Sequence, residues 1–315
     1  MKEIGGYLEL EEFHGEEYYP EAVAVNNGRN GLLYLIKARN IHKLYIPYYL
    51  CDSVSGLCER EGCPYEFYPI HEDFTPVFEE SVREGEYLYV VNYFGRLEDA
   101  KIVALKAQYK NVILDNVQAF FHQPLDGIDT IYSCRKFFGM PDGGYIATDA
   151  RLPDELPVDV SMNRMRHVFG RYEVASASDF YNDFKANDHS FKSLELRMMS
   201  RLTKNLLKAI DYEAVRKKRE ENYAFLADNL KNVNRLPDIR PIGPYMYPFY
   251  CENGMEVKKK LAIQKIYIPT LWPNVLKCNR PLEKDYAENI LPLPCDQRYG
   301  LEDMAIIVEN IINLI

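Results

Sequence analysis

Residues 43–69 read KLYIPYYLCDSVSGLCEREGCPYEFYP, and this stretch sets the fold class. Lys43–Pro47 and Tyr65–Pro69 are short apolar runs typical of strands. Ser53–Glu61, between them, carries apolar residues at the three- and four-residue spacing of a helix, and Gly62 ends it. A strand, a helix and a second strand in succession indicate a parallel pair joined by a crossover.

The same alternation runs through the first half of the chain. Further strands are predicted at Ala22–Val25, Tyr87–Asn92, Asn111–Leu114, Thr130–Ser133 and Gly144–Thr148, and further helices at Gly31–Arg39 and Leu97–Tyr109. This order predicts an α/β domain whose mostly parallel, doubly wound sheet carries helices on both faces.

The second half has a different pattern. From about residue 151 to 190 the alternation is lost, and long helices are predicted at Phe191–Leu207 and Tyr212–Leu230. Beyond Pro237 we expect a small α+β domain built from strands at Tyr245–Tyr250 and Tyr267–Ile268 and helices at Met255–Gln264 and Leu301–Ile315. The expected division is a large domain over residues 1–207 and a small domain over residues 208–315.

The composition excludes several classes of protein. The 315 residues are 47% hydrophobic and 27% charged, as in ordinary globular proteins, and the net charge of -9 argues against nucleic-acid binding. The chain begins with mixed charged and glycine residues and has no long apolar run, so we expect a cytoplasmic protein that does not enter a membrane. None of the seven cysteines forms a Cys-x-x-Cys pair, so no metal site is expected. We expect the cysteines to be reduced thiols.

Ligands of parallel sheets bind beyond the carboxyl ends of the strands, and two such places carry polar residues. Asn26-Asn27-Gly28-Arg29-Asn30 precedes a helix, where free N–H groups and an arginine would suit a phosphate, although such a segment is also an ordinary turn. Asp115 ends an apolar strand, where it could pair with a protonated ring nitrogen or cap a helix.

A third place is the segment from Ser133 to Gly144. Lys136 follows a strand and is flanked by Phe137, Phe138 and glycines, so burial would lower its pKa and favour imine formation, although a lysine in an apolar loop often only extends to solvent. Ser133 could donate a hydrogen bond to a phosphate beside it.

Taken in order, these segments resemble the fold-type I enzymes that use pyridoxal 5'-phosphate (PLP), and among them the DegT/DnrJ/EryC1/StrS aminotransferases, which are mostly sugar aminotransferases. The resemblance covers nearly the whole chain, including Tyr247-Pro248-Phe249, Ile268-Pro269-Thr270-Leu271-Trp272 and Leu291-Pro292-Leu293-Pro294-Cys295. It implies an aspartate aminotransferase-like large domain, a small C-terminal domain and PLP as cofactor. It also implies a homodimer that moves an amino group from an amino acid such as glutamate to a keto-sugar nucleotide.

The resemblance also assigns roles to residues. Lys136 would form the Schiff base with PLP and later move the proton, and Asp115 would bind the pyridine nitrogen. Gly28, Arg29, Asn30 and Ser133 would hold the phosphate, whereas Gln118 and Asn92 would lie near the ring oxygen. Arg164 and His167 belong to an irregular stretch that could contact the sugar nucleotide or simply be a solvated loop.

The sequence departs from the family pattern in two respects. The aromatic residue that usually stacks on the cofactor is replaced by Cys51 in the closest alignment, so that either Tyr49 stacks instead or the stacking contact is thin. No Asn-Arg-Met segment is found near Asn187–Ser193. Three alternatives stay open, namely another PLP-dependent reaction, an amino-acid aminotransferase on the same scaffold, and a non-catalytic relative that binds cofactor or sugar. The dehydratases of the family carry histidine in place of the lysine, and this chain has Lys136.

Overall fold

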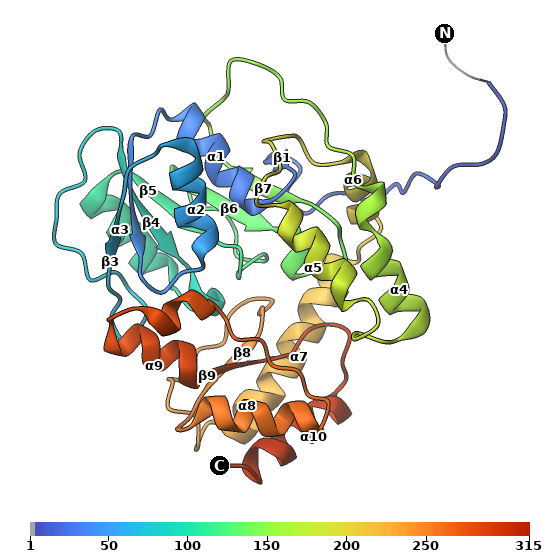
Figure 1. Cartoon of the computed structure of the whole chain (residues 1–315). Coiled ribbons are helices and arrows are strands. Elements are labelled where there is room, and N and C mark those ends of the chain that lie inside the picture. The colour runs from blue at the N-terminus through green and yellow to red at the C-terminus, as the bar shows by residue number, and fades with distance from the viewer. Residues whose placement is uncertain (1–3) are drawn as a thin grey trace.

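The computed structural model describes residues 4–315 and contains two sheets (Figure 1). The elements of the larger sheet and its helices are β1 (Val23–Val25), α1 (Gly28–Ala38), β2 (Lys43–Pro47), α2 (Asp52–Glu61), β3 (Tyr65–Tyr68), β4 (Glu86–Val91), α3 (Asp99–Tyr109), β5 (Val112–Asp115), β6 (Asp129–Ser133) and β7 (Gly144–Ala147). The prediction of alternating strands and helices is confirmed for this half of the chain.

The large sheet has the order β1-β7-β6-β5-β4-β2-β3. The pairs among β2 to β6 are parallel, whereas β7 runs antiparallel to both β6 and β1, so the sheet is mostly parallel as predicted. Since β4, β5 and β6 are neighbours in this order, their carboxyl ends lie together at one edge of the sheet.

Side chains alternate between the two faces of the sheet. Ile131 and Ile146 lie beneath α1, where a Cβ added to Gly31 would come within 3.1 Å of Ile131 and 3.3 Å of Ile146. Their neighbours Tyr132 and Tyr145 face the other way, into a buried aromatic cluster that includes Tyr19. Gly31 therefore lets α1 lie close against the sheet.

The middle of the chain is more helical than predicted. α4 (Arg166–Val174) and α5 (Tyr181–Ser190) occupy the stretch expected to be irregular, and only α6 (Arg201–Leu207) forms from the helix predicted at Phe191–Leu207. Residues 194–199 are extended instead, because their backbone groups bind the strand edge: Asn26 N donates to Arg197 O at 3.0 Å and Met199 N to Ala24 O at 3.1 Å.

The C-terminal part contains α7 (Tyr212–Leu230), β8 (Tyr247–Tyr250), α8 (Gly254–Ile263), α9 (Pro281–Asn289), β9 (Ile290–Leu293) and α10 (Leu301–Ile312), grouped below the large sheet in Figure 1. β8 and β9 form an antiparallel pair with its own apolar core against α7 and α10. The strand predicted at Tyr267–Ile268 is wrong, since no strand forms there, and α9 and β9 were missed. The domain boundary after residue 207 stays a prediction. Among residues 4–315, no helix is long and apolar enough to cross a membrane.

Candidate active site

Three neighbouring strands end in polar residues. Asn92 follows β4, Asp115 ends β5, and Ser133 ends β6, directly before a single 3₁₀ turn over Cys134–Lys136. This edge of the sheet therefore brings together residues that are up to 44 positions apart in the chain, counting from Asn92 to Lys136. We call Asp115, Gln118, Ser133, Lys136 and the N-terminus of α1 the Lys136 site.

Asp115 is a buried carboxylate with a fixed orientation. It is 3% exposed, and its two oxygens accept hydrogen bonds from the Tyr89 hydroxyl at 2.7 Å and from Val117 N at 2.8 Å. Burial raises the pKa of Asp115, while the charge of Lys136 and both hydrogen bonds oppose this. No helix begins after β5, so the helix-cap alternative for Asp115 is excluded. Tyr89 was not singled out in the sequence.

Lys136 faces Asp115 across the site. Burial lowers the pKa of its amine, and the charges of Asp115 and Cys51 partly offset this effect. Its Nζ lies 5.7 Å from the centroid of the Tyr245 ring, and the residues that the structure describes offer it no hydrogen-bond acceptor. A desolvated amine without a partner is suited to react as a nucleophile.

The turn that carries Lys136 is held from the C-terminal part of the chain. The carbonyl oxygen of Phe137 accepts hydrogen bonds from Arg219 Nη2 at 3.1 Å and from Gln297 Nε2 at 2.8 Å. Arg219, on α7, is 1% exposed and also donates to Pro244 O at 2.9 Å. Sequence reasoning missed these tethers because Arg219 and Gln297 lie 83 and 161 positions beyond Lys136 and match no motif.

The N-terminus of α1 closes one side of the site. The side chain of Asn27 caps the helix by accepting from Asn30 N at 2.8 Å, whereas the N–H groups of Gly28 and Arg29 have no intrahelical acceptor. A Cβ on Gly144 would come within 2.9 Å of Asn27 C, Gly28 N and Tyr132 O, so only glycine allows β7 to pass beneath this turn. Burial lowers the pKa of Arg29, whose Nε is buried without a partner.

Two predicted site amides are engaged inside the protein. Asn30 Nδ2 donates to Asn26 Oδ1 and to Glu195 O, each at 2.8 Å, and thereby holds the extended segment 194–199. Asn92 accepts from Leu97 N at 2.9 Å and donates to Asn116 at 3.0 Å. The roles proposed for both residues stay predictions.

Gln118 differs from those two amides. Its Oε1 accepts from Phe94 N at 2.9 Å, but its Nε2 is buried with no acceptor among the described residues. A buried donor left without a partner is costly and calls for an explanation, such as a ligand atom.

The two candidates for stacking on a cofactor lie in different surroundings. Tyr49 is 1% exposed and packs edge-on against Trp272 with ring centroids 4.5 Å apart, inside an aromatic cluster with Phe74, Tyr93 and Tyr286. Cys51 is half-buried at the start of α2, near enough to both Lys136 and Arg29 to influence the pKa of each. Cys51 is therefore the one of the two that lies beside the site.

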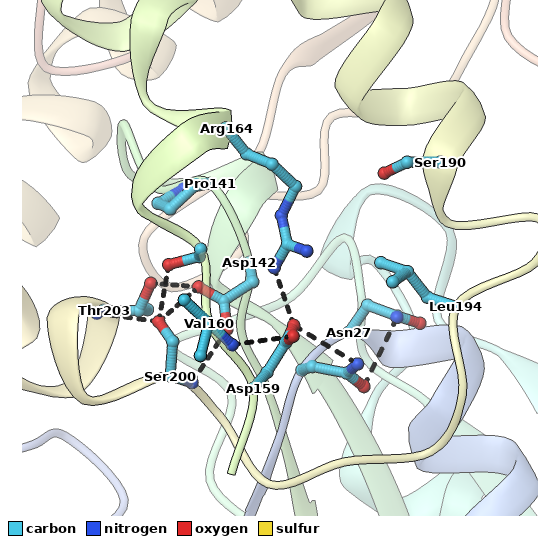
Figure 2. Close-up of polar contacts among 12 residues, drawn as sticks. Asn27, Pro141, Asp142, Asp159, Val160, Arg164, Ser190, Leu194, Ser200 and Thr203 are labelled. Carbon is cyan, nitrogen blue, oxygen red and sulfur yellow. Dashed lines mark hydrogen bonds and ion pairs between the residues drawn. The ribbon is translucent and has the colours of Figure 1, made fainter.

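A polar network supports the loop that follows Lys136 (Figure 2). Asp142 is fully buried and accepts from Ser200 N at 2.9 Å, from Ser200 Oγ at 2.8 Å and from the Thr203 hydroxyl, and the Ser200 side chain in turn caps α6. Beside it, Asp159 accepts from Arg164 Nη2 at 2.6 Å. We call these residues the Asp142 network. Arg164, predicted to contact a sugar nucleotide, is thus paired within the protein.

Solved structures of other proteins identify the fold. It is the fold-type I arrangement of DegT/DnrJ/EryC1/StrS sugar aminotransferases, matched over 93% of this chain. No family model matches the sequence, and no curated protein matches it either.

Individual solved structures give the extent of the likeness. A DegT DnrJ EryC1 StrS aminotransferase from Brucella abortus aligns with a TM-score of 0.64 at 15% identity, covering 93% of this chain and 85% of its own. The sugar aminotransferase CalS13 from Micromonospora echinospora gives 0.60 at 16%, covering 93% and 87%. NtdA from Bacillus subtilis, which holds the cofactor PMP, gives 0.66 at 16%, covering 93% and 73%. At these identities the likeness establishes the fold.

Proposed function

We propose that this chain is a PLP-dependent aminotransferase. The observation that carries the proposal is the position of two titratable groups at the carboxyl end of the sheet: Lys136, whose amine has no hydrogen-bond partner among the described residues, and the buried Asp115, whose carboxylate is fixed by Tyr89 and Val117. Solved structures of the same fold include ones with PLP or PMP.

The residues present fit this cofactor. The buried Nε2 of Gln118 and the buried Nε of Arg29 are donors without acceptors, as expected of groups that meet the oxygens of a ligand. The first turn of α1 offers the N–H groups of Gly28 and Arg29, and Ser133 ends the neighbouring strand, so that a phosphate would be held there. When bound, PLP supplies an electron sink for the substrate carbon.

Each residue then has a defined task. Asp115, whose ionised form is favoured by its two hydrogen bonds and by Lys136 against the effect of burial, would hold a proton on the ring nitrogen when PLP is bound. Lys136 would attach the cofactor and, once released, would be the group that takes and returns the substrate proton. Arg219 and Gln297 keep the Lys136 turn in place through Phe137 O. The free Nε2 of Gln118 would donate to an oxygen of the cofactor.

We propose a keto-sugar linked to a nucleotide as acceptor and an amino acid such as glutamate as donor. Support comes from solved structures with this fold that are described as sugar aminotransferases, among them CalS13 from Micromonospora echinospora and Spr1654 from Streptococcus pneumoniae, the latter as a putative one. A homodimer and a cytoplasmic location complete the proposal. The free state of all seven cysteines agrees with a reducing compartment. The exposed apolar side chains of α4 and α5, among them Phe169, Tyr172 and Tyr181, offer a surface for a second copy.

The experiment tests two things separately, the attachment of PLP to Lys136 and the choice of amino-group acceptor. Borohydride reduction of the PLP-treated protein, followed by peptide mapping, should place the label on Lys136, and a label on another lysine would contradict the assignment. Protein converted with glutamate is then mixed with keto-sugar nucleotides and, separately, with simple keto acids. Recovery of the visible absorption band with simple keto acids only would mean an amino-acid aminotransferase.

A further inference from the structure

A line of side-chain hydrogen bonds connects the edge of the sheet that carries the Lys136 site with the start of α3. It joins Asn92, which follows β4, to Asn116, then to His122, and finally to Asp99, the first residue of α3. Both asparagines are fully buried, whereas the side chains of His122 and Asp99 are 15% and 66% exposed. We call these four residues the His122 chain.

A backbone N–H group fixes the direction of every hydrogen bond in the His122 chain. Leu97 N can only donate, so the atom of Asn92 that it contacts at 2.9 Å is the oxygen Oδ1. Asn92 Nδ2 therefore donates to Asn116 Oδ1, and Asn116 Nδ2 donates to His122 Nδ1, each at 3.0 Å. Because Nδ1 accepts, it carries no proton. His122 is thus neutral in this arrangement, and its proton is on Nε2, which donates to Asp99 Oδ1 at 2.8 Å.

The backbone of His122 is held from outside the His122 chain. Its carbonyl oxygen accepts hydrogen bonds from the hydroxyl groups of Tyr132 at 2.9 Å and of Tyr19 at 3.1 Å, and both tyrosines are buried. Tyr132 belongs to β6, and Tyr19 to the segment before β1. The large sheet and the N-terminal segment therefore place the ring of His122 where it meets Asn116.

The other end of the His122 chain acts on Asp115. Asn92 N donates to Asp115 O at 3.0 Å, and Asn116 lies between Asp115 and Val117, whose N–H holds one carboxylate oxygen of Asp115 at 2.8 Å. Without an acceptor on His122, Asn116 Nδ2 would be a buried donor without a partner, which is costly. The amide of Asn116 could not rotate by half a turn to escape this, because Asn92 presents a donor to it.

We propose that His122 is a positioning residue for Asp115: its neutral ring accepts from Asn116 and so keeps residues 115–117 in the arrangement that orients the carboxylate. In this proposal His122 acts through Asn116 and has no contact of its own with the cofactor. The inference rests on the proposed function and deepens it, because Asp115 is the proposed partner of the ring nitrogen of PLP.

Two substitutions separate the roles of the two nitrogen atoms of the ring. In His122→Asn the amide oxygen takes the approximate place of Nδ1 and can accept from Asn116, whereas in His122→Gln the amide takes the place of Nε2 and can reach only Asp99. A role in packing alone would favour His122→Gln, which is closer in size to histidine. His122→Leu removes both contacts. The control is His42→Leu, at an exposed histidine whose ring contacts Glu84 O.

The first measurement is made on the PLP-free protein. Hydrogen exchange of the Val117 amide, followed by NMR, reports on the bond to the Asp115 carboxylate. We expect exchange roughly 5- to 10-fold faster in His122→Leu and His122→Gln, as for the loss of about one hydrogen bond, and near the wild-type rate in His122→Asn and in the control. The amide of Leu88 on β4, which donates to Asn111 O, should exchange at the same rate in all of them.

Two further measurements complete the test. Nitrogen NMR of the PLP-free wild type should place the proton of the His122 ring on Nε2, and the proton should stay there in Asp99→Ala, because Asn116 still donates to Nδ1. PLP affinity, followed by fluorescence, should fall roughly 3- to 10-fold in His122→Leu and His122→Gln and be retained in His122→Asn.

Several results would overturn the inference. They are a proton on Nδ1, wild-type exchange of Val117 or wild-type PLP affinity in His122→Leu, and a rescue by His122→Gln in place of His122→Asn. Equal acceleration of exchange at Leu88 and Val117 would show a general loss of stability and would also contradict it. Failure of the wild type to bind PLP would refute the proposed function, whereas exchange and ring NMR of the PLP-free protein would still decide whether His122 holds the Asp115 segment.

Discussion

Two regions of the molecule treat buried polar groups in opposite ways. In the Asp142 network, Asp142 receives three hydrogen bonds and Asp159 pairs with Arg164, of which only Nε is left without an acceptor among the described residues. At the Lys136 site, Gln118 Nε2 and Arg29 Nε are buried without partners among the described residues, and burial lowers the pKa of Lys136. Paired groups stabilise the fold, whereas unpaired groups are costly until something binds them. The comparison predicts that substitutions in the first region lower stability and that substitutions in the second lower function.

The largest effect is expected at Lys136. Lys136→Ala should abolish attachment of the cofactor and reduce transamination by at least four orders of magnitude, because no other lysine lies in the site. The variant should unfold at the same urea concentration as the PLP-free wild type or a higher one, since a poorly solvated amine has been removed. A clear loss of stability in the PLP-free protein would contradict the division into two regions.

A smaller loss of activity is expected at Asp115. Asp115→Asn should keep PLP but slow the reaction about 100-fold, equal to about 2.7 kcal/mol of transition-state stabilisation. Burial raises the pKa of Asp115, so wild-type activity should fall as the pH drops through that raised value and the carboxylate is protonated.

Tyr89 offers a milder probe of the same group. Tyr89→Phe removes a hydrogen bond that favours the ionised carboxylate, so the pKa of Asp115 should rise further and the acidic limb of the pH profile should move to higher pH. Rates measured across the pH range distinguish the two variants, because Asp115→Asn should lack this limb. An unmoved limb in Tyr89→Phe would assign it to another group.

Substitutions in the Asp142 network should lower the stability of the protein. Asp142→Ala leaves Ser200 N, Ser200 Oγ and the Thr203 hydroxyl without their acceptor and should lower the free energy of unfolding by about 2–4 kcal/mol. Urea denaturation of the PLP-free protein measures this, with the exposed Asp154→Ala as control, expected within about 0.5 kcal/mol of the wild type.

The smallest difference in stability is expected between substitutions of two arginines, Arg29 in the first turn of α1 and Arg39 at its C-terminal end. Arg39→Gln breaks a two-point contact with the buried Asp129 and should cost about 1–3 kcal/mol of stability. Arg29→Gln, which removes a guanidinium with a buried unpaired Nε, should change the stability of the PLP-free protein by no more than about 0.5 kcal/mol. It should instead weaken PLP binding, as followed by fluorescence. Equal losses of stability in both variants would refute the contrast.

Local patterns in the sequence were enough to predict the strands and helices of the large sheet. They failed where distant backbone decided the structure, as in residues 194–199, whose carbonyl and amide groups bind Ala24 and Asn26 in place of a helix. They also failed at β9, because Pro292 argues against a strand. β9 is tolerated since it pairs with a single neighbour, β8, where Pro292 lies opposite Pro248.

The residues of the candidate site also fall into two groups, those that local sequence patterns could predict and those that they could not. Asp115, Ser133 and Lys136 could be placed at one edge because they follow neighbouring parallel strands. Tyr89 and Arg219 could not, since their importance depends on the carboxylate and the carbonyl groups that they contact, and these come from other elements. The sequence did not show whether Tyr49 or Cys51 lies where a residue would stack on the cofactor. Only the tertiary structure shows that the ring of Tyr49 packs against Trp272.

The shared acceptor at Phe137 has a consequence for the order in which the site can form during folding. Its two donors, Arg219 and Gln297, lie 82 and 160 positions beyond Phe137 in the chain. The strands of the large sheet can pair before those segments pack against it, but until then the turn of Lys136 has neither tether. The position of the lysine is therefore fixed only after the C-terminal part has packed against the large sheet.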